Sequence, residues 1–250
     1  MVDNLKKGHL NPITQVIYEV VEAFRELGFE VADGPEVEDE FHNFDALNVP
    51  ADHPSRDMQD TFWLKDFPLL LRTQTSAVQA RFMEKNKPPF KILAPGKCFR
   101  QEATDARHEA QLHQIEGLLV DHHVNVSHLK GYLDKFFQKL YGPKAHIRLR
   151  PSYFPFVEPG FEADMACFSC NQTGKMSDGR NCPLCGGGGW IEIGGTGMVH
   201  PKVLKNMGFD PNEWSGFAFG FGGERLAMLK WGIEDTRIFF NGDLRFIDQF

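Results

Sequence analysis

A hairpin with a polar tip, residues 99–117, constrains the fold of this chain more than any other stretch. Apolar runs at residues 91–94 and 118–120 flank it, and both are typical of β-strands. A polar run, residues 103–112, separates the two strands. A loop of about ten residues inside a compact domain is usually functional rather than a simple connection. We therefore predict two antiparallel strands joined by a functional loop.

Charged and amide side chains are expected on one face of this hairpin. Arg100 and Glu102 lie two residues apart, as do Gln114 and Glu116, so each pair shares a face if both segments are strands. Burying any of these groups without a partner costs several kcal/mol. Two interpretations remain open at this point, a surface hairpin with cross-strand ion pairs and a binding site.

Composition limits the class of protein. The 250 residues, 42% of them hydrophobic, can bury one large core, and we expect a single α/β domain. The sequence has 23 Phe but only 4 Tyr, which favours aromatic packing without hydroxyl groups. It has no run of about 18 apolar residues and no signal peptide, so we expect a cytoplasmic protein without a membrane span. A net charge of −7 argues against a module that grips nucleic acid mainly through phosphates.

Capping residues and turn residues divide the chain into elements. Asn11 and Pro12 predict the start of an amphipathic helix that ends at Gly28 and leads into a strand. Residues 39–60 are rich in turn formers, and their Ser, His and Asp lack the strand-turn-helix context of a hydrolase nucleophile. Residues 194–201 are expected to turn into the next helix.

Four cysteines form two CxxC pairs, Cys167 with Cys170 and Cys182 with Cys185, separated by eleven residues. Two such pairs with glycines after the second fit a tetrahedral thiolate Zn²⁺ site, and we predict a structural zinc in an insertion at residues 166–190. The alternatives are disulfides, which a cytosolic protein disfavours, or a redox pair, which does not need four cysteines. Cys98 stands alone and is expected to be a core thiol.

Two further segments point to ligands. Gly220-x-Gly222-x-x-Arg225 follows an alternating strand and opens a helix, where a cation beside free backbone N–H groups suits a phosphate. The glycines alone are a weak signal, since a dinucleotide site needs a third glycine and a later acidic residue. Phe154-Pro155-Phe156 holds two rigid rings that can present an edge and a face to a third ring, although a core aromatic pair is the commoner case.

These segments together resemble the class II aminoacyl-tRNA synthetases. The Arg100 hairpin is similar to their motif 2, the Arg225 segment to motif 3, and the helix, strand and proline at residues 11–35 to motif 1. Two further segments, His113–Gly117 at the end of the hairpin and Phe154-Pro155-Phe156, resemble the phenylalanine-specific family, in particular its bacterial α subunits. The resemblance implies an α/β fold over residues 1–250, with an antiparallel sheet flanked by helices. The cysteine segment, read from its own spacing, adds a small zinc-ribbon-like insertion that many relatives lack.

The family implies an activity and partners as well. We expect a ligase that activates L-phenylalanine with ATP and Mg²⁺ to phenylalanyl-adenylate, then transfers it to tRNA(Phe) with release of AMP and diphosphate. The partner expected is a β subunit, in a heterotetramer of two α and two β subunits. Because an apolar pocket discriminates an added hydroxyl only about a hundredfold, rejection of tyrosine needs an editing site, which the family places on β.

Residue roles are carried over from the matching motifs. Arg100, His108 and Arg225 are the expected catalytic residues, all of them at ATP. Glu102 is expected at the adenine amino group and Leu112 where relatives often carry a stacking aromatic residue. The phenylalanine-binding residues implied are Gln74, Ser76, Gln114, Glu116, Phe154, Phe156 and Ala218, and Glu192 is the expected helper for Mg²⁺.

Some features leave alternatives open. The Ser76 hydroxyl could equally be a helix N-cap, and Gln59 and Gln74 stand where some relatives have Trp and His. The family normally carries an N-terminal helical arm for tRNA, and the sequence begins just before the catalytic domain, so we expect a truncated or short form. A paralogue that forms an adenylate without charging tRNA, and a zinc-ribbon nucleic-acid module on an inactive synthetase fold, are the two rival functions.

Overall fold

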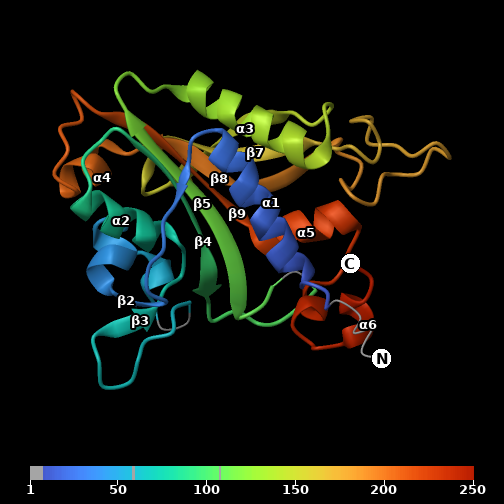
Figure 1. The fold of residues 1–250 in the computed structure, drawn as a ribbon, viewed down its shortest axis with the longest axis horizontal. Helices are drawn as coiled ribbons and strands as arrows, with labels where there is room; N and C mark the ends of the chain where they lie inside the picture. The colour runs from blue at the N-terminus through green and yellow to red at the C-terminus, as the bar shows by residue number, and fades with distance from the viewer. Residues whose placement is uncertain (1–7, 58–59, 107) are drawn as a thin grey trace, which may run out of the picture.

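A seven-stranded, mostly antiparallel sheet forms the centre of the molecule (Figure 1). The computed structural model describes residues 8–57, 60–106 and 108–250. The strand order is β1-β4-β5-β9-β8-β7-β6, and only β1 and β4 run parallel. The strands are β1 (Glu30–Val31), β4 (Phe90–Phe99), β5 (Gln111–Asp121), β6 (Ile147–Phe154), β7 (Val157–Ala166), β8 (Trp190–Val199) and β9 (Ser215–Gly222), with β2 (Val37–Asp39) and β3 (Leu69–Leu71) in a separate two-stranded sheet.

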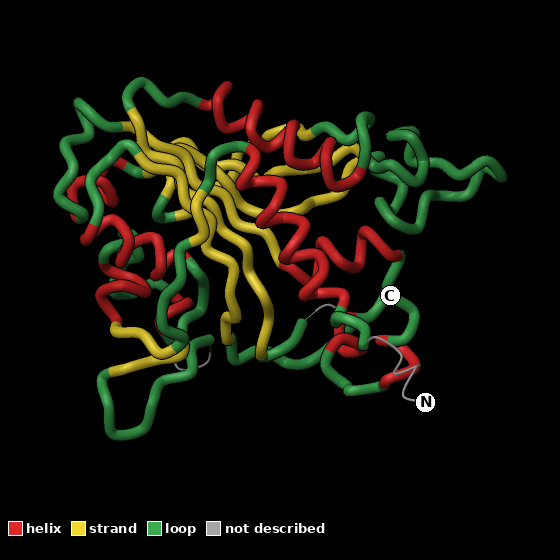
Figure 2. The backbone as a smooth tube through the Cα atoms, viewed as in Figure 1, coloured by secondary structure: helices red, strands yellow, loops and turns green. Residues whose placement is uncertain are grey.

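Helices cover both faces of the large sheet (Figure 2). Those that the structure describes are α1 (Pro12–Glu26), α2 (Ser76–Lys85), α3 (Val126–Tyr141), α4 (Pro201–Asn206), α5 (Gly223–Trp231) and α6 (Leu244–Ile247), with short helical turns η1 (Phe41–Asp45), η2 (Pro54–Arg56) and η3 (Thr236–Phe239). The predicted α/β class, an antiparallel sheet flanked by helices, is confirmed.

Alternation along the strands separates two cores. Ile115 and Leu119 of β5 pack with α1, α3 and α5, whereas Leu118 and Val120 pack with α2 and α4. Successive side chains of a strand point to opposite faces, so each apolar strand residue is committed to one of the two layers. The consequence for function is that the α2 and α4 layer shares its face of the sheet with the cavity described below.

Phenylalanine rings fill the core on the α1 and α3 side. The ring of Phe24 stacks on Phe136 at 4.7 Å and on Phe219 at 4.9 Å, measured between ring centroids, and Phe219 lies 5.2 Å from Phe221. All four side chains are buried. Offset aromatic pairs of this kind contribute about 0.5–1.5 kcal/mol each beyond area burial. The packing without hydroxyls that the composition favoured is confirmed here.

The first helix begins and ends at the residues expected. The Asn11 side chain accepts a hydrogen bond from the N–H of Ile13 (2.9 Å), and Pro12 is the first helical residue. Gly28 follows the C-cap with φ +84°, a backbone conformation that residues other than Gly or Asn rarely adopt. The helix is amphipathic, since Val16, Val20 and Phe24 are buried against the sheet.

Two local expectations are wrong. The first hairpin strand ends at Phe99, so Arg100 and Glu102 belong to the loop and not to one strand face. The backbone explains this, because the N–H of Gln101 donates to the carbonyl of Asp60 (3.1 Å) and not to β5, so the hydrogen-bond pattern between β4 and β5 does not continue. Residues 194–199 do not turn; they continue β8, and the helix begins only at Pro201.

The cysteine segment leaves the sheet between β7 and β8 and projects from the body (Figure 1). The segment begins after Ala166, the last residue of β7, and ends before Trp190, the first residue of β8. The ring of Phe168 stacks on Tyr141 at the end of α3, with 5.7 Å between centroids and 12° between planes. The Tyr141 hydroxyl donates to the carbonyl of Leu226 in α5 (3.0 Å). The insertion is therefore coupled to the helical layer.

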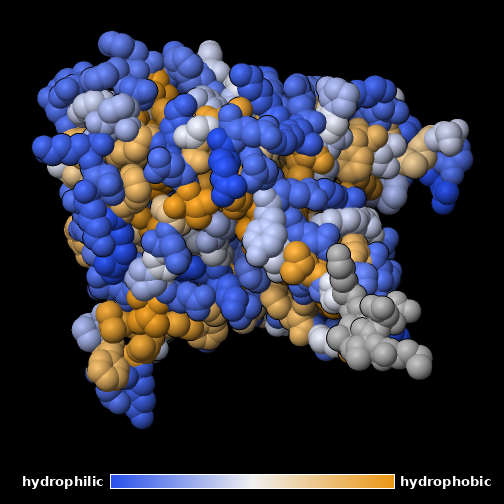
Figure 3. All heavy atoms as spheres, in the orientation of Figure 1, coloured by the Kyte–Doolittle hydropathy of each residue, from blue (hydrophilic) through white to orange (hydrophobic). Residues whose placement is uncertain are grey.

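Exposed apolar side chains gather at the corner formed by β2 and β3 (Figure 3). Val37 of β2 is 40% exposed, and Phe67, just before β3, is 64% exposed. Contiguous apolar surface of this kind is typical of protein interfaces.

Among the described residues, no helix is both long and apolar enough to cross a membrane.

Candidate functional site

A cavity of about 760 Å³ opens on the face of the sheet that carries α2 and α4. Strands β5, β8 and β9 form its floor, and the loop after β4 and the end of β6 contribute to its walls. Most of the residues that the sequence assigned to substrates line it. These are Gln74, Ser76, Arg100, Glu102, Leu112, Gln114, Glu116, Phe154, Phe156 and Ala218.

One end of the cavity is polar and centres on the buried carboxylate of Glu116. The Ser76 hydroxyl donates to Glu116 Oε2 (2.5 Å), and Gln79 Nε2 donates to the same oxygen (3.2 Å). Burial raises the pKa of Glu116, and the bond from Ser76 opposes that shift. The N-cap alternative for Ser76 is wrong, since the cap position is Thr75 and the hydroxyl faces Glu116. A carboxylate with neutral donors only is suited to an incoming ammonium group.

A chain of hydrogen bonds links this carboxylate to Arg100. In the amide orientation that satisfies both of its ends, Gln114 donates to Glu116 Oε1 (3.1 Å) and accepts from Arg100 Nη2 (3.3 Å). Arg100 Nε also donates to the carbonyl of Thr73 (3.2 Å). The guanidinium is thereby held at the cavity wall with donors left over for an anion.

The opposite end is apolar and aromatic. Phe154 and Phe156 lie 5.9 Å apart between centroids with only 19° between their planes. We had expected one ring to present its edge and the other its face to a third ring. The two planes are instead nearly parallel, so a third ring meets both at nearly the same angle. Ala218 is fixed beside them by the Thr196 hydroxyl, which donates to its carbonyl (2.7 Å). Phe156 and Ala218 both pack against the buried cluster of Leu118, Val199 and Val203.

Glycines make the floor between the two ends. A Cβ at Gly195 would meet the Phe154 ring at 2.9 Å, and one at Gly194 would meet the carbonyl oxygen of Gly220 at 2.2 Å. Gly220 pairs directly with Glu116 across β5 and β9. A larger residue at Gly195 would press on the Phe154 ring, and one at Gly194 would collide with the backbone of β9 and with Phe221 of the core on the α1 and α3 side.

Three expected residues lie outside the cavity lining. His108 is in the loop, where its ring nitrogen Nδ1 pairs with Asp105 (2.9 Å). Arg225 is in the first turn of α5, as the Gly220–Arg225 motif predicted, and Nη2 donates to the backbone oxygen of Glu192 (3.5 Å). The Glu192 carboxylate, 63% exposed, is ion-paired with Arg150 (2.9 Å). Of the three, Arg225 and Glu192 lie next to each other, and His108 lies in the loop between β4 and β5.

Helix α5 is anchored by a residue that the sequence did not single out. Glu224 accepts hydrogen bonds from both the N–H (2.9 Å) and Nδ1 (2.7 Å) of His113 on β5. Because Arg225 is the next residue, this contact positions its backbone relative to the hairpin. The prediction for Gln59 lies outside the described residues.

Other missed residues line the cavity from unexpected places. Gln79 lies one helical turn after Ser76 and so shares its face, a signal that helical spacing could have given. Phe44, Leu47 and Val49 come from the turn-rich segment that sequence reasoning had set aside. Their segment begins as a π-helical turn, which has neither the period of a strand nor that of an α-helix.

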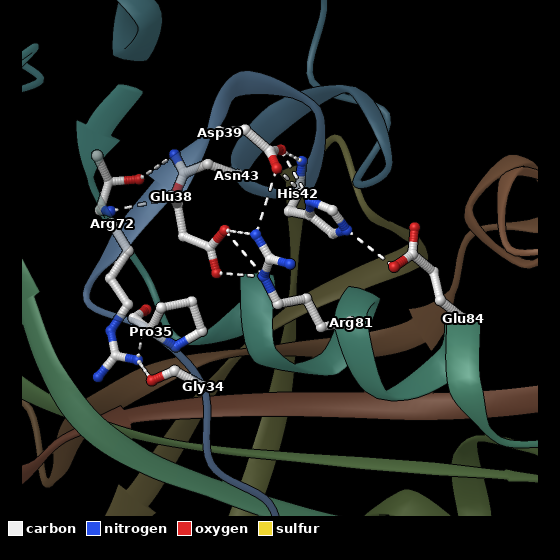
Figure 4. A network of polar contacts seen from close by, with 10 residues as sticks. Gly34, Pro35, Glu38, Asp39, His42, Asn43, Arg72, Arg81 and Glu84 are labelled. Carbon is white, nitrogen blue, oxygen red and sulfur yellow. Dashed lines mark hydrogen bonds and ion pairs between the residues drawn. The ribbon is translucent and has the colours of Figure 1, made fainter. Parts of the chain in front are cut away.

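An ion network holds that segment against α2 (Figure 4). Arg81 of α2 pairs with the buried Glu38 (2.6 Å) and with Asp39 (3.2 Å), and His42 lies between Asp39 (2.7 Å) and Glu84 (2.9 Å). Two carboxylates and a histidine this close could hold a metal ion, but the guanidinium of Arg81 already supplies the positive charge. We interpret the network as structural.

We expect the contribution of His42 to stability to depend on pH. Burial lowers the pKa of His42, but the hydrogen bonds to Glu84 and Asp39 outweigh it and raise the pKa above 6.5. Its contribution to the free energy of unfolding is therefore complete below that value and is lost as the pH rises through the folded-state pKa. Melting temperatures of the wild type and His42→Gln should converge between about pH 6 and pH 9. A difference that stays constant over this range would contradict a charged His42.

The four cysteines of the insertion converge on one point. Cys167 and Cys182 have sulfurs 3.8 Å apart, Cys170 and Cys185 3.7 Å apart, and all four thiols are free. Four thiolates at 2.3 Å around a tetrahedral Zn²⁺ are about 3.8 Å from one another. Backbone N–H groups point at two of the sulfurs, Gly174 at Cys170 (3.3 Å) and Gly189 at Cys185 (3.2 Å), as in metal-bound thiolates. The donor set fits zinc, and the unbonded sulfurs exclude disulfides in this state.

Comparison with known proteins gives one family. The model of the tRNA synthetases class II core domain (F) matches residues 1–250. The phenylalanine–tRNA ligase alpha subunit of Lawsonia intracellularis is 53% identical over 243 residues, 97% of this chain and 70% of that protein. That of Halalkalibacterium halodurans is 55% identical over 98% of this chain and 69% of the relative. The crystal structure of pyrrolysyl-tRNA synthetase from Desulfitobacterium hafniense has a similar fold, with a TM-score of 0.65, 15% identity and coverage of 92% and 73% of the two chains.

Proposed function

Because this chain belongs to the class II tRNA synthetase core family and, within it, to the alpha subunits of phenylalanine–tRNA ligases, we propose that it activates L-phenylalanine with ATP and transfers it to tRNA(Phe). The observation that carries the proposal is the two-ended cavity. Its buried carboxylate suits an ammonium group and its aromatic end suits a phenyl ring. Arg100 lines the same cavity, is linked to that carboxylate through Gln114, and has donors available for a phosphate.

Activation needs no nucleophile from the protein. The carboxylate oxygen of phenylalanine attacks the α-phosphorus of ATP in line, a new O–P bond forms, and the bond to diphosphate breaks. The chain's residues contribute position and charge. In this proposal Arg100 donates to the α-phosphate, Glu102 accepts from the adenine amino group, and Leu112 packs on the base. His108 contacts the phosphates from the loop, and Arg225 stacks on adenine near the γ-phosphate.

Mg²⁺ would neutralise charge on the phosphate oxygens when it binds with ATP. We assign Glu192 to it. Its backbone oxygen already contacts Arg225, and its carboxylate forms an exposed ion pair with Arg150, the kind that contributes little to stability and can be exchanged. Zn²⁺ has a different role in the proposal, as a structural ion on the four cysteines at residues 166–190.

Gln74, Ser76, Gln114 and Glu116 would hold the amino-acid head group, and Phe154, Phe156 and Ala218 the ring. We expect Glu116→Gln to raise KM for phenylalanine about 10- to 100-fold, because a bond between two charged groups is lost, with KM for ATP nearly unchanged. KM for phenylalanine should also rise in the wild type as the pH falls through the raised pKa of Glu116, since the neutral acid does not balance an ammonium. Equal changes in the two KM values would contradict this role.

The proposal includes partners. The name of the relatives implies a second subunit, and we propose an assembly of two α and two β chains in the cytoplasm, with editing of tyrosine on β. The net charge of −7 supports this, because a chain in which acidic residues outnumber basic ones needs another source of phosphate contacts to hold tRNA. The exposed Val37 and Phe67 offer apolar surface for such a partner.

Thermal stability with adenylate analogues tests the proposal directly. Non-hydrolysable phenylalanyl-, tyrosyl- and histidyl-adenylates are added to the zinc-loaded chain, with and without β subunit. A ligand present at about 100 times its Kd stabilises the native state by about 2.7 kcal/mol. We expect the largest rise in melting temperature with the phenylalanyl compound and a smaller one with the tyrosyl compound. No rise in either preparation would overturn the proposal.

Aminoacylation separates the rival function. With β subunit and tRNA(Phe) present, the proposal requires phenylalanyl-tRNA to form. Diphosphate exchange that depends on phenylalanine, without any charging of tRNA, would identify an adenylate-forming paralogue instead.

A further inference from the structure

One wall of the cavity's aromatic end is built by a segment outside the regular sheet and helices. We call residues 41–49 the strap; it runs from η1 through a turn and lies against α2. Its buried side chains Phe44, Leu47 and Val49 line the cavity and join the same apolar cluster as Phe156 and Ala218. The strap therefore bounds the space in which the substrate ring would lie.

A second wall of this end is also irregular. Phe154-Pro155-Phe156 lies where β6 ends, and β6 is the edge strand of the sheet, hydrogen-bonded to β7 alone. The register of that pair shifts between Ser152 and Phe154. The backbone of Phe156 is tied on its far side, where its carbonyl accepts from the N–H of His200 (3.0 Å). Strand pairing thus leaves the distance from this wall to the strap undetermined.

A single side chain spans the two walls. Asn48 Nδ2 donates to the carbonyl oxygen of Pro155 at 2.6 Å, although the two residues are 107 positions apart. Other asparagines fix the strap elsewhere. Asn43 exchanges two hydrogen bonds with Thr73 (3.0 and 3.2 Å), and Asn206 of α4 donates to the carbonyls of Asp45 (3.2 Å) and Ala46 (3.4 Å). Of these three, Asn48 is the one that reaches the aromatic wall.

The backbone of Asn48 restricts what can replace it. Its φ is +58°, in the left-handed region that Asn and Gly tolerate and most other residues avoid. Its N–H donates to the carbonyl of Asp45 (3.1 Å), which closes the turn. Asn48 thus serves both the turn and the cross-link, and variants can separate the two.

We propose that Asn48 is a positioning residue that sets the width of the ring-binding end, and so helps to select phenylalanine, by fixing Leu47 and Val49 at a set distance from Phe154 and Phe156. The inference rests on the proposed function and adds a specificity determinant that does not itself touch the substrate. Without the cross-link, the two irregular walls move relative to each other, and binding of a flat, six-membered ring loses its preorganisation.

The test uses the chain with its β subunit and measures diphosphate exchange. Asn48→Gly keeps the left-handed backbone and removes the donor. Asn48→Asp keeps the size and shape but sets an acceptor against the Pro155 oxygen. We expect KM for phenylalanine to rise about five- to tenfold in the glycine variant, the usual effect of one lost neutral hydrogen bond, and further in the aspartate variant. KM for ATP and kcat should change less than about twofold.

A general loss of stability would not change the selectivity between amino acids, so selectivity is the second quantity to measure. The ratio of kcat/KM for phenylalanine to that for leucine should fall in both variants, because a wider end no longer favours a flat ring. Asn206→Ala is the matched control, since it removes bonds to the strap that do not reach the aromatic wall. It should lower the melting temperature while leaving the ratio as in the wild type.

The outcomes separate the inference from the proposed function. If the wild type shows exchange with phenylalanine and both Asn48 variants keep its KM and its ratio, the inference is overturned and the proposed function stands. Equal changes in Asn206→Ala would also overturn it, because the effect would then be that of a loosened strap. A wild type without phenylalanine-dependent exchange would overturn both. Should Asn48→Asp fail to fold, the glycine variant alone decides.

Discussion

Replacing Arg100 with alanine is expected to slow the formation of phenylalanyl-adenylate by about a hundred- to a thousandfold, the usual effect of removing one preorganised charged donor at a reacting centre. The guanidinium is already oriented before substrates bind, through Thr73 and Gln114. It therefore costs little reorganisation as charge develops on the α-phosphate. Diphosphate exchange at saturating phenylalanine and ATP measures the loss.

The stability of the variant distinguishes this role from a structural one. Arg100 lies in a loop, and its hydrogen-bond partners at Thr73 and Gln114 keep other contacts, so we expect the melting temperature to stay within a few degrees of the wild type. Arg100→Lys retains the charge but loses the forked geometry, and its rate of adenylate formation should lie between those of the wild type and Arg100→Ala. Arg245→Ala, whose side chain is 91% exposed, is the control for removing one positive charge. A loss below about tenfold would contradict contact with the α-phosphate.

The sequence was informative where local rules and spatial position coincide. Apolar runs at residues 91–94 and 118–120 predicted two strands, and these strands pair with Leu93 opposite Gly117. The glycine-rich strand before Arg225 lies next to the hairpin, with Gly220 opposite Glu116. Because these neighbouring strands carry or directly adjoin motif residues such as Gln114, Glu116 and Arg100, a resemblance based on them also predicted which side chains meet in the cavity.

Other parts could not be read from the sequence for physical reasons. The order of strands depends on pairings between distant segments, such as β9 between β5 and β8, which no local pattern encodes. The end of β4 is set by a backbone bond from Gln101 to Asp60, a residue about forty positions away, so Arg100 was wrongly placed on a strand. The strap was missed because a π-helical turn has no periodic signature.

Loss of the Zn²⁺ ion that we propose for the four cysteines is expected to have the largest effect on stability. The segment between β7 and β8 has little secondary structure of its own, and its described interior is the four sulfurs and a few apolar side chains such as Met176 and Leu184. Without the metal, four thiols must share a space that suits thiolates. Cys167, Cys170 and Cys182 also belong to the main core on the α1 and α3 side, so the disturbance is not confined to the projecting loops.

We expect Cys182→Ser, or prolonged chelation of the wild type, to lower the melting temperature by roughly 10 °C, as a loss of about 3–5 kcal/mol does in a domain of this size. Burial raises the pKa of Cys182, but backbone N–H groups of Cys185 and Leu184 outweigh it and lower the pKa to about 7, so this thiol is ready to bind metal at neutral pH. Calorimetry together with metal analysis measures the effect, and one zinc per chain is expected in the wild type.

If zinc is lost, we expect activity to fall because α5 is displaced, and not because the cavity itself changes. Phe168 of the insertion stacks on Tyr141, and Tyr141 holds the carbonyl of Leu226, the residue after Arg225. Loosening this path should raise KM for ATP more than KM for phenylalanine, whose pocket lies on the other face of the sheet. Cys98→Ala is the control, since it removes a buried thiol outside the cluster and should keep its zinc. A metal-free wild type, or a Cys182→Ser variant as stable as the wild type, would mean that the four cysteines fold the insertion without a metal.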